Sequence, residues 1–123
     1  MKNSFKITIC LLTSLILFLS TMLIFNYDKD KKVSIRGTID TATYSPSDSN
    51  GNLMIVGNIE HDTMYDIASV SFDKKTKIYL YDSKKKFNPE DLRQGMKVEV
   101  MFHDDIAEIY PVKAKAKIIR VYN

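Results

Sequence analysis

Two histidines, His61 and His103, are the side chains best suited to acid–base or metal chemistry. Two aspartates lie within five residues of His61, and two more follow His103 directly. A metal centre or an acid–base pair needs several such groups to converge, and histidine beside aspartate in a turn is more often simply solvated. We therefore expect neither a catalytic residue nor a metal site. A small metal-dependent or acid–base hydrolase is the alternative.

Other catalytic motifs are missing from the sequence. The four glycines are isolated, so there is no glycine-rich phosphate loop, and no serine or cysteine nucleophile motif occurs. The single cysteine, Cys10, lies inside an apolar run, which excludes a disulfide framework or a cysteine-based zinc site elsewhere. We expect no cofactor.

The segment around Glu108 and Tyr110 is the most specific candidate for ligand recognition. Residues two apart on a strand share a face, so the carboxylate and the phenol are placed to contact a polar or sugar-like ligand together. The alternative is structural. In that case Tyr110 packs, its hydroxyl bonds the backbone, and Pro111 ends the strand.

Lysines at positions 113, 115 and 117 alternate with smaller or apolar residues, which predicts one exposed basic stripe. Further positive charge comes from Lys74, Lys75 and the run Lys84–Lys86. An anionic cell-wall polymer is the partner that Lys113, Lys115 and Lys117 would attract. The alternative is a solvated edge strand that lysines protect from pairing with another chain.

The overall charge argues against nucleic acid as a partner. Two of the 18 basic residues, Lys2 and Lys6, precede the apolar run, so the remainder has 16 basic against 15 acidic residues. A nucleic-acid-binding domain is typically strongly basic.

Residues 7–25 form a run without charge, glycine or proline. As a helix the run would be about 28 Å long, close to the hydrocarbon thickness of a bilayer. We expect a transmembrane anchor there, preceded by a cytoplasmic tail over residues 1–6 and followed by a linker over residues 26–32. A cleaved signal peptide is the alternative, although no small-residue cleavage site follows the run.

From residue 33 the hydrophobic period becomes two, which is typical of strands with one buried face. Strands are predicted over residues 33–40, 53–61, 67–72, 76–81, 96–102, 106–110 and 114–122. Asn88 and Pro89 begin one short helix that Gly95 ends, and residues 103–105 are predicted to be a hairpin turn. This pattern predicts a small, mainly β, OB-like antiparallel barrel over residues 33–123, with a flat β-sandwich as the competitor.

The stretch from Gly95 to Tyr122 resembles the YobA-like proteins of Gram-positive bacteria, a family of unknown function. The matching positions are Gly95, Val98, Val100, Phe102, Glu108, Tyr110, Pro111, Ala114 and Ala116. Ile109 departs from the serine that the family most often has between the acid and the tyrosine. The resemblance covers nearly all of residues 33–123.

The resemblance implies export, because family members carry a signal peptide or a lipoprotein signal. It therefore implies an extracytoplasmic domain behind a cytoplasmic N-terminus. We expect a membrane-anchored binding or accessory module, which contacts an anionic cell-wall polymer or an envelope protein and is held in the cell membrane through residues 7–25.

Overall fold

The computed structural model describes residues 8–17 and 32–122, and the chain divides into two units, residues 1–32 and 33–123. Residues 8–17 are helical, and the Thr13 hydroxyl donates to the carbonyls of Ile9 (2.9 Å) and Cys10 (3.0 Å), as expected for a hydroxyl in an apolar helix. The expected span over residues 7–25 lies partly outside the described residues. Among the helices that the structure does describe, none combines the length and apolar character needed to cross a membrane.

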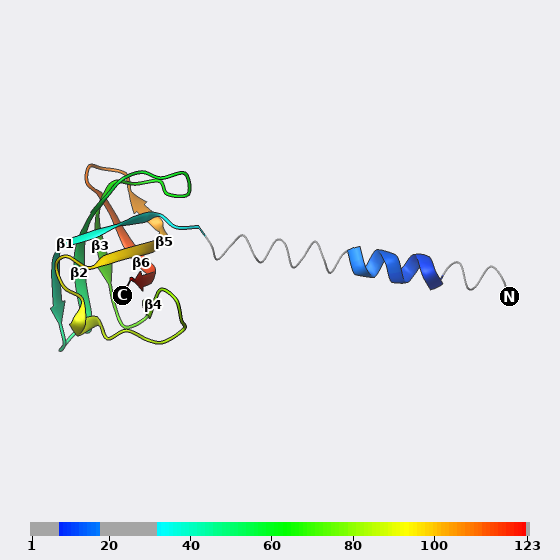
Figure 1. Cartoon of the computed structure of the whole chain (residues 1–123), viewed down its shortest axis with the longest axis horizontal. Helices are drawn as coiled ribbons and strands as arrows, with labels where there is room; N and C mark the ends of the chain where they lie inside the picture. The colour runs from blue at the N-terminus through cyan, green and yellow to red at the C-terminus, as the bar shows by residue number, and fades with distance from the viewer. Residues whose placement is uncertain (1–7, 18–31, 123) are drawn as a thin grey trace. The chain divides into compact units, whose positions relative to one another are not determined.

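The second unit is a closed barrel of five strands with a sixth strand at its side (Figure 1). Its elements are β1 (Ile35–Ser45), β2 (Asn50–Gly57), β3 (Ile67–Phe72), β4 (Lys77–Leu80), the 3₁₀ helix η1 (Pro89–Asp91), β5 (Lys97–Ala107) and β6 (Val112–Val121). The sheet order is β3-β2-β1-β5-β6, and β3 also pairs with β6, which closes the barrel. The mainly β barrel with one short helix is confirmed, and the flat sandwich is wrong.

The pairing is not antiparallel throughout, contrary to the prediction. β6 runs parallel to β3 and to β4, and antiparallel to β5. β6 therefore has a neighbouring strand on each side over most of its length, so its lysines do not protect a free edge. That alternative explanation of the lysine stripe is wrong.

The barrel interior is filled by the alternating apolar residues that the sequence indicated. Ile35 and Ile39 of β1 are buried, as are Ala68, Val70 and Phe72 of β3. The largest side chains that are almost fully enclosed are Ile35, Ile39, Leu53, Ile55, Val70, Val98, Val100, Ile119 and Val121. Glu99 and Met101 of β5 are buried as well, so both faces of that strand are covered.

Two glycines let β1 and β2 approach closely. Gly37 and Gly57 face each other in the register of the two strands. A Cβ atom on Gly57 would clash with the carbonyl oxygen of Arg36, and one on Gly37 would clash with the carbonyl oxygen of Val56. Since these obstacles are backbone atoms, neither can move aside without moving a strand.

The predicted hairpin turn at residues 103–105 is wrong. β5 runs on to Ala107, and the ladder between β5 and β6 passes from Phe102–Ala116 to Ile106–Ala114 with a register shift. Residues 103–105 thus form a bulge, a feature that absorbs extra residues without ending a strand. The chain turns at residues 108–111, where Tyr110–Pro111 is a cis peptide bond.

The short helix is smaller than predicted. Asn88 is its N-cap and accepts a hydrogen bond from the amide of Glu90 at 3.1 Å, as expected. The helix ends with Leu92 as its C-cap, so Gly95 does not terminate it. Gly95 has a φ of +91° and lies in the turn before β5, a backbone conformation that glycine adopts without a steric penalty.

Candidate functional site

An open cavity of about 530 Å³ lies at the barrel end that carries the β1–β2 turn. Its walls come from the end of β1 and the β1–β2 turn, from the end of β3 and the β3–β4 loop, from β4, and from the segment that leads into η1. The lining residues include Tyr44, Phe72, Tyr79 and Phe87, together with Lys74, Lys75, Lys77 and Lys86. Ligand sites in small barrels commonly occupy such a mouth, and this volume is in their usual range.

The β3–β4 loop is fixed by its own hydrogen bonds. The Asp73 amide donates to Thr76 Oγ1 (3.1 Å), and the Lys75 amide donates to Asp73 Oδ1 (2.8 Å). The Thr76 hydroxyl in turn donates to the carbonyl of Ala116 on β6 (3.0 Å). This pattern of a short polar side chain bonding the backbone two residues on holds the loop in one conformation, so its lysines project from a defined frame.

An aromatic wall stands behind this loop. Phe72 is buried, and the ring of Tyr44 stacks on it with centroids 6.0 Å apart and planes 4° apart. Gly51 makes room for this pair, since a Cβ atom there would clash with the Phe72 ring. The half-buried ring of Tyr44, supported by Phe72, thus offers an apolar surface to anything that enters the cavity.

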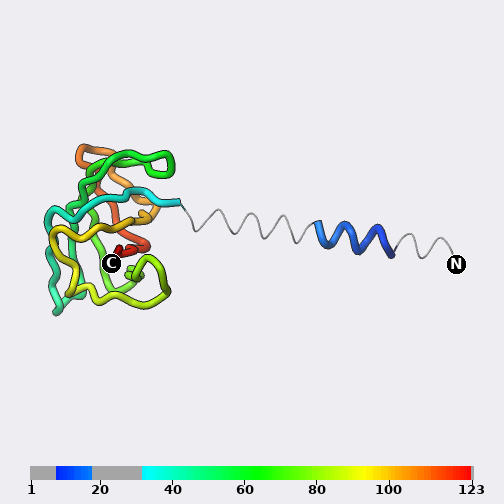
Figure 2. Tube along the Cα trace, viewed as in Figure 1, coloured from blue at the N-terminus to red at the C-terminus, as the bar shows by residue number. Residues whose placement is uncertain are grey.

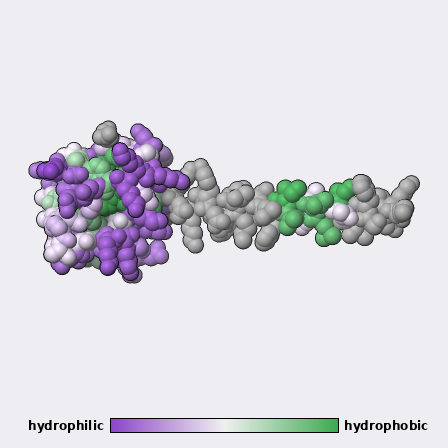
Figure 3. All heavy atoms as spheres, turned by 90° about the horizontal axis from the view of Figure 1, so that it is seen from below, coloured by the Kyte–Doolittle hydropathy of each residue, from purple (hydrophilic) through white to green (hydrophobic). Residues whose placement is uncertain are grey.

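The rim of the cavity is basic. Lys74, Lys75, Lys77 and Lys86 are exposed, and none of them has an ion-pair partner among the described residues. Figure 3 views the domain from below, the side of the β1–β2 turn in Figure 1, and shows hydrophilic residues around a smaller hydrophobic region.

Asp73, the acidic residue in the cavity lining, forms an ion pair with a lysine. Lys115 Nζ lies 2.7 Å from Asp73 Oδ2. This hydrogen-bonded ion pair holds the pKa of Asp73 below its usual range, so the carboxyl stays charged and paired with Lys115. The four rim lysines are left to attract an anion from solution, with an attraction that salt screens.

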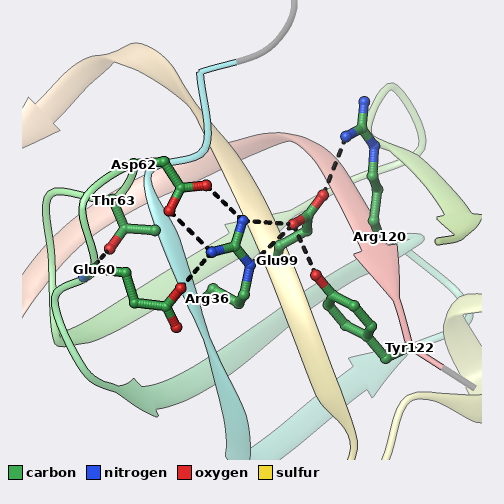
Figure 4. A network of polar contacts seen from close by, with 7 residues as sticks. All are labelled: Arg36, Glu60, Asp62, Thr63, Glu99, Arg120 and Tyr122. Carbon is green, nitrogen blue, oxygen red and sulfur yellow. Dashed lines mark hydrogen bonds and ion pairs between the residues drawn. The ribbon is translucent and has the colours of Figure 1, made fainter.

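A second polar cluster surrounds Glu99 on the outer face of β1, β5 and β6 (Figure 4). Glu99 is 3% exposed and accepts hydrogen bonds from Arg36 Nε (3.2 Å) and Nη2 (3.1 Å), from Arg120 Nη1 (3.1 Å) and from the Tyr122 hydroxyl (3.1 Å). Arg36 also donates to Glu60 at 2.7 Å and to Asp62 at 2.8 and 3.0 Å.

This cluster of ion pairs and hydrogen bonds links three strands of the barrel and one loop. Arg36 is on β1, Glu99 on β5 and Arg120 on β6, while Glu60 and Asp62 belong to the loop between β2 and β3. Asp62 is the main cause of the raised pKa of Arg36, and the pKa of Asp62 is lowered in return. Within the described residues no buried side-chain polar atom lacks a partner, so Glu99 is fully engaged. A carboxylate held in this way is suited to stabilise the fold, and we assign it no catalytic role.

Ionisation of Tyr122 makes the free energy of unfolding depend on pH in the alkaline range. Burial, followed by the charge of Glu99, raises the pKa of Tyr122 from 10.0 to about 12. Between these values the unfolded chain releases the phenolic proton and the folded chain keeps it, so the free energy of unfolding falls as the pH rises.

We expect Tyr122→Phe to lower stability near pH 9 by about 1 kcal/mol, because a hydrogen bond is lost. The difference from the parent protein should then narrow between pH 10 and 12, because only the parent has this phenol to ionise. Urea unfolding at stepwise pH measures both effects. If the free energies of unfolding of the parent and of Tyr122→Phe stay the same distance apart from pH 10 to 12, the raised pKa of Tyr122 is contradicted.

The structure does not bring the sequence-predicted binding residues together. Glu108 and Tyr110 lie in the β5–β6 turn and line a shallow depression of about 290 Å³. Lys113 and Lys115 line a different, polar depression of about 430 Å³ with serines of β3. Lys117 is exposed on the same face of β6. The predicted basic stripe is therefore present, and its ligand-binding role stays a prediction.

The two histidines lie on different elements. His61 is exposed in the β2–β3 loop, and His103 is exposed in the bulge of β5. Residues 8–17 and 32–122 contain no group of three or more His, Cys, Asp or Glu side chains placed to hold a metal ion.

Sequence reasoning missed the Glu99 cluster and the cavity. One available signal was the acid itself, since Glu99 stands between two core valines at the centre of a strongly apolar strand. The sequence signal for the cavity was weaker and consists of the lysines around position 75. Their aromatic neighbours Tyr44 and Phe87 are far away in the sequence, so only the folded chain shows the site.

Comparison with known proteins gives one family. A family model described as "Protein of unknown function (DUF3221)" matches residues 44–123, which include β2 to β6 and the whole cavity lining. No curated protein and no solved structure matches the chain.

Proposed function

The chain belongs to the DUF3221 family, and from this premise we propose that its barrel is an extracytoplasmic binding module for an anionic ligand. The observation that carries the proposal is the cavity at the β1–β2 end. Four lysines that have no ion-pair partner within residues 8–17 and 32–122 stand over an aromatic wall there, and Lys115 forms an ion pair with the neighbouring carboxylate. Lysine attracts phosphates and carboxylates as a point charge, while the rings offer contact area for an apolar or planar part of the ligand.

The strand connectivity supports an OB-like classification. β1, β2 and β3 form a meander, and β6 closes the barrel against β3 and β5. OB-folds bind ligands across strands 2 and 3 and with the loop between strands 1 and 2. The cavity uses the end of β3 and Ser49 of the β1–β2 turn.

The cellular placement is the second part of the proposal. The uncharged run over residues 7–25 supports a membrane anchor, and the resemblance to the YobA-like proteins supports the extracytoplasmic side. An anionic cell-wall polymer is then the partner within reach, and an envelope protein with an acidic segment is the competitor.

Binding of polyphosphate to the full chain in mild detergent tests the ligand class. We expect the variant with Lys74, Lys75, Lys77 and Lys86 changed to glutamine to bind roughly tenfold or more weakly at low salt, from four modest charge contacts. The difference should shrink at high salt, because exposed charges are screened. Fluorescence anisotropy with a labelled polyphosphate chain measures the affinity, and a neutral dextran of similar size controls for nonspecific binding.

Two matched variants locate the site. Lys113→Gln together with Lys117→Gln tests the β6 stripe and keeps Lys115, which neutralises Asp73 of the cavity. The pair His61→Ala with His103→Ala tests whether the histidines contribute to binding. We expect the stripe variant to lose less affinity than the cavity variant, and the histidine variant to lose none. If the stripe variant loses more, the ligand follows β6 and the cavity proposal is wrong.

A further inference from the structure

The barrel end opposite the cavity carries a group of exposed apolar side chains. Residues 32–122 expose six large hydrophobic side chains, and four of these lie in two loops, those between β2 and β3 and between β5 and β6. We call them the apolar tip: Ile59, Met64, Ile109 and Tyr110. Their exposed fractions are 62%, 54%, 57% and 74%.

The two loops are neighbours. Met64 from one loop, and Ile109 and Tyr110 from the other, line the same shallow depression of about 290 Å³. Figure 2 shows the loop of residues 58–66 (green) and that of residues 108–111 (orange) at one end, with residues 46–49 and 81–88 at the other. An exposed apolar group of this kind marks an interaction surface.

Hydrogen bonds and ion pairs fix the β2–β3 loop, which carries two of the apolar tip residues. The Thr63 amide donates to the carbonyl of Glu60 at 3.2 Å, and the Glu60 amide donates to Thr63 Oγ1 at 2.7 Å. Arg36 pins the same loop through Glu60 and Asp62. The apolar side chains are therefore presented at low conformational cost.

The chain enters the barrel beside the tip. The amides of Met64 and Tyr65 donate to the carbonyl of Ser34, at 3.0 and 3.2 Å. Seven residues, 26–32, separate the uncharged run from residue 33. Even fully extended they span at most about 25 Å. The length of this segment therefore limits how far residue 33 can lie from the end of the uncharged run.

We propose that the apolar tip rests in the interfacial layer of the lipid bilayer. This inference rests on the membrane anchorage proposed above. Tyrosine favours the headgroup level, where its ring is apolar and its hydroxyl is wet, and isoleucine and methionine favour the adjacent acyl chains. The cavity at the other end of the barrel then faces away from the membrane, open to ligands.

Charge does not drive the contact. The carboxylates near the tip include Glu60, Asp62, Asp66 and Glu108, so anionic headgroups are not attracted. Apolar insertion is insensitive to salt, unlike the lysine-rimmed cavity. Contact at the tip and binding in the cavity are therefore separable by ionic strength.

The chain has no tryptophan, so Tyr110→Trp introduces a single tryptophan at the tip, which can be excited selectively over the tyrosines. The full-length variant is reconstituted into phosphatidylcholine vesicles with and without bromine-labelled acyl chains. We expect emission at shorter wavelength than in detergent-free buffer and several-fold stronger quenching than for the control Lys84→Trp, which labels the opposite end. The shorter emission wavelength and the stronger quenching should both persist at high salt. Ile109→Trp is an independent reporter if the first variant folds poorly.

Vesicle flotation of the same samples separates the two proposals. Flotation together with water-exposed emission from Trp variants at 109 and 110 overturns the tip contact and leaves the anchor standing. Absence of flotation overturns both. A blue shift that depends on the protein-to-lipid ratio shows that the tip contacts another protein copy, and that result also overturns the bilayer contact.

Discussion

Replacing Glu99 with alanine should lower the free energy of unfolding by about 3–5 kcal/mol, the cost of removing one partner from a buried ion pair. Glu99 is enclosed by two arginines and a phenol, and these three donors would lose their shared acceptor at once. Urea denaturation at neutral pH, followed by circular dichroism, measures the loss.

Glu60 provides the matched control, because it is the same residue type bonded to the same arginine. Its side chain is 44% exposed, whereas that of Glu99 is 3% exposed. Exposed ion pairs contribute about 0–1 kcal/mol, so Glu60→Ala should cost little. Equal losses from the two substitutions would show that burial of the carboxylate does not decide its contribution.

Gly57→Ala should destabilise the barrel by on the order of 3 kcal/mol, at the upper end of the usual cost of overpacking. The added methyl group would meet the carbonyl oxygen of Arg36 on the facing strand, and relief requires the β1–β2 pair to separate. That movement would also displace the Arg36 side chain from the Glu99 cluster. Thermal unfolding and the chemical shifts of the β1–β2 amides report both effects.

Gly95→Ala is the control for this substitution. A Cβ atom on Gly95 would meet nothing within 4 Å, although its φ of +91° carries a penalty for any other residue. That penalty is about 1–2 kcal/mol. If Gly95→Ala proves as damaging as Gly57→Ala, the close approach of the strands is not what makes Gly57 necessary.

The sequence was sufficient to predict the parts of the fold that depend on local pattern. The strand over residues 67–72 was predicted at its observed bounds, because Ala68, Val70 and Phe72 alternate with polar neighbours. The Asn88 cap follows from the preference of short polar side chains for a helix start. In both cases the deciding residues are within a few positions of one another.

Features that depend on distant residues were predicted poorly. His103 and the two aspartates after it have turn-forming character, yet pairing with β6 keeps them inside β5 as a bulge. Glu99 is buried only because residues 63 positions before it and 21 and 23 positions after it fold over it. Tertiary pairing overrides local preference at such places.

Dependence on distant residues also explains why the β6 stripe is visible in the sequence and the cavity is not. The basic stripe of β6 is a local pattern, and it is present on the strand as predicted. The cavity combines Tyr44 with lysines around position 75 and with Phe87, and their proximity depends on how the barrel closes. A linear pattern contains no signal for that convergence.

The position of β6 in the chain has a consequence for how the protein is made. β6 pairs with β3, β4 and β5, all of which precede it, and it supplies Val112, Ala116, Ile119 and Val121 to the interior. Until these residues have left the ribosome, β3 has an unpaired edge and the core is incomplete. Long-range pairings of this kind form late and slowly. The barrel core therefore cannot be completed before β6 has been synthesised.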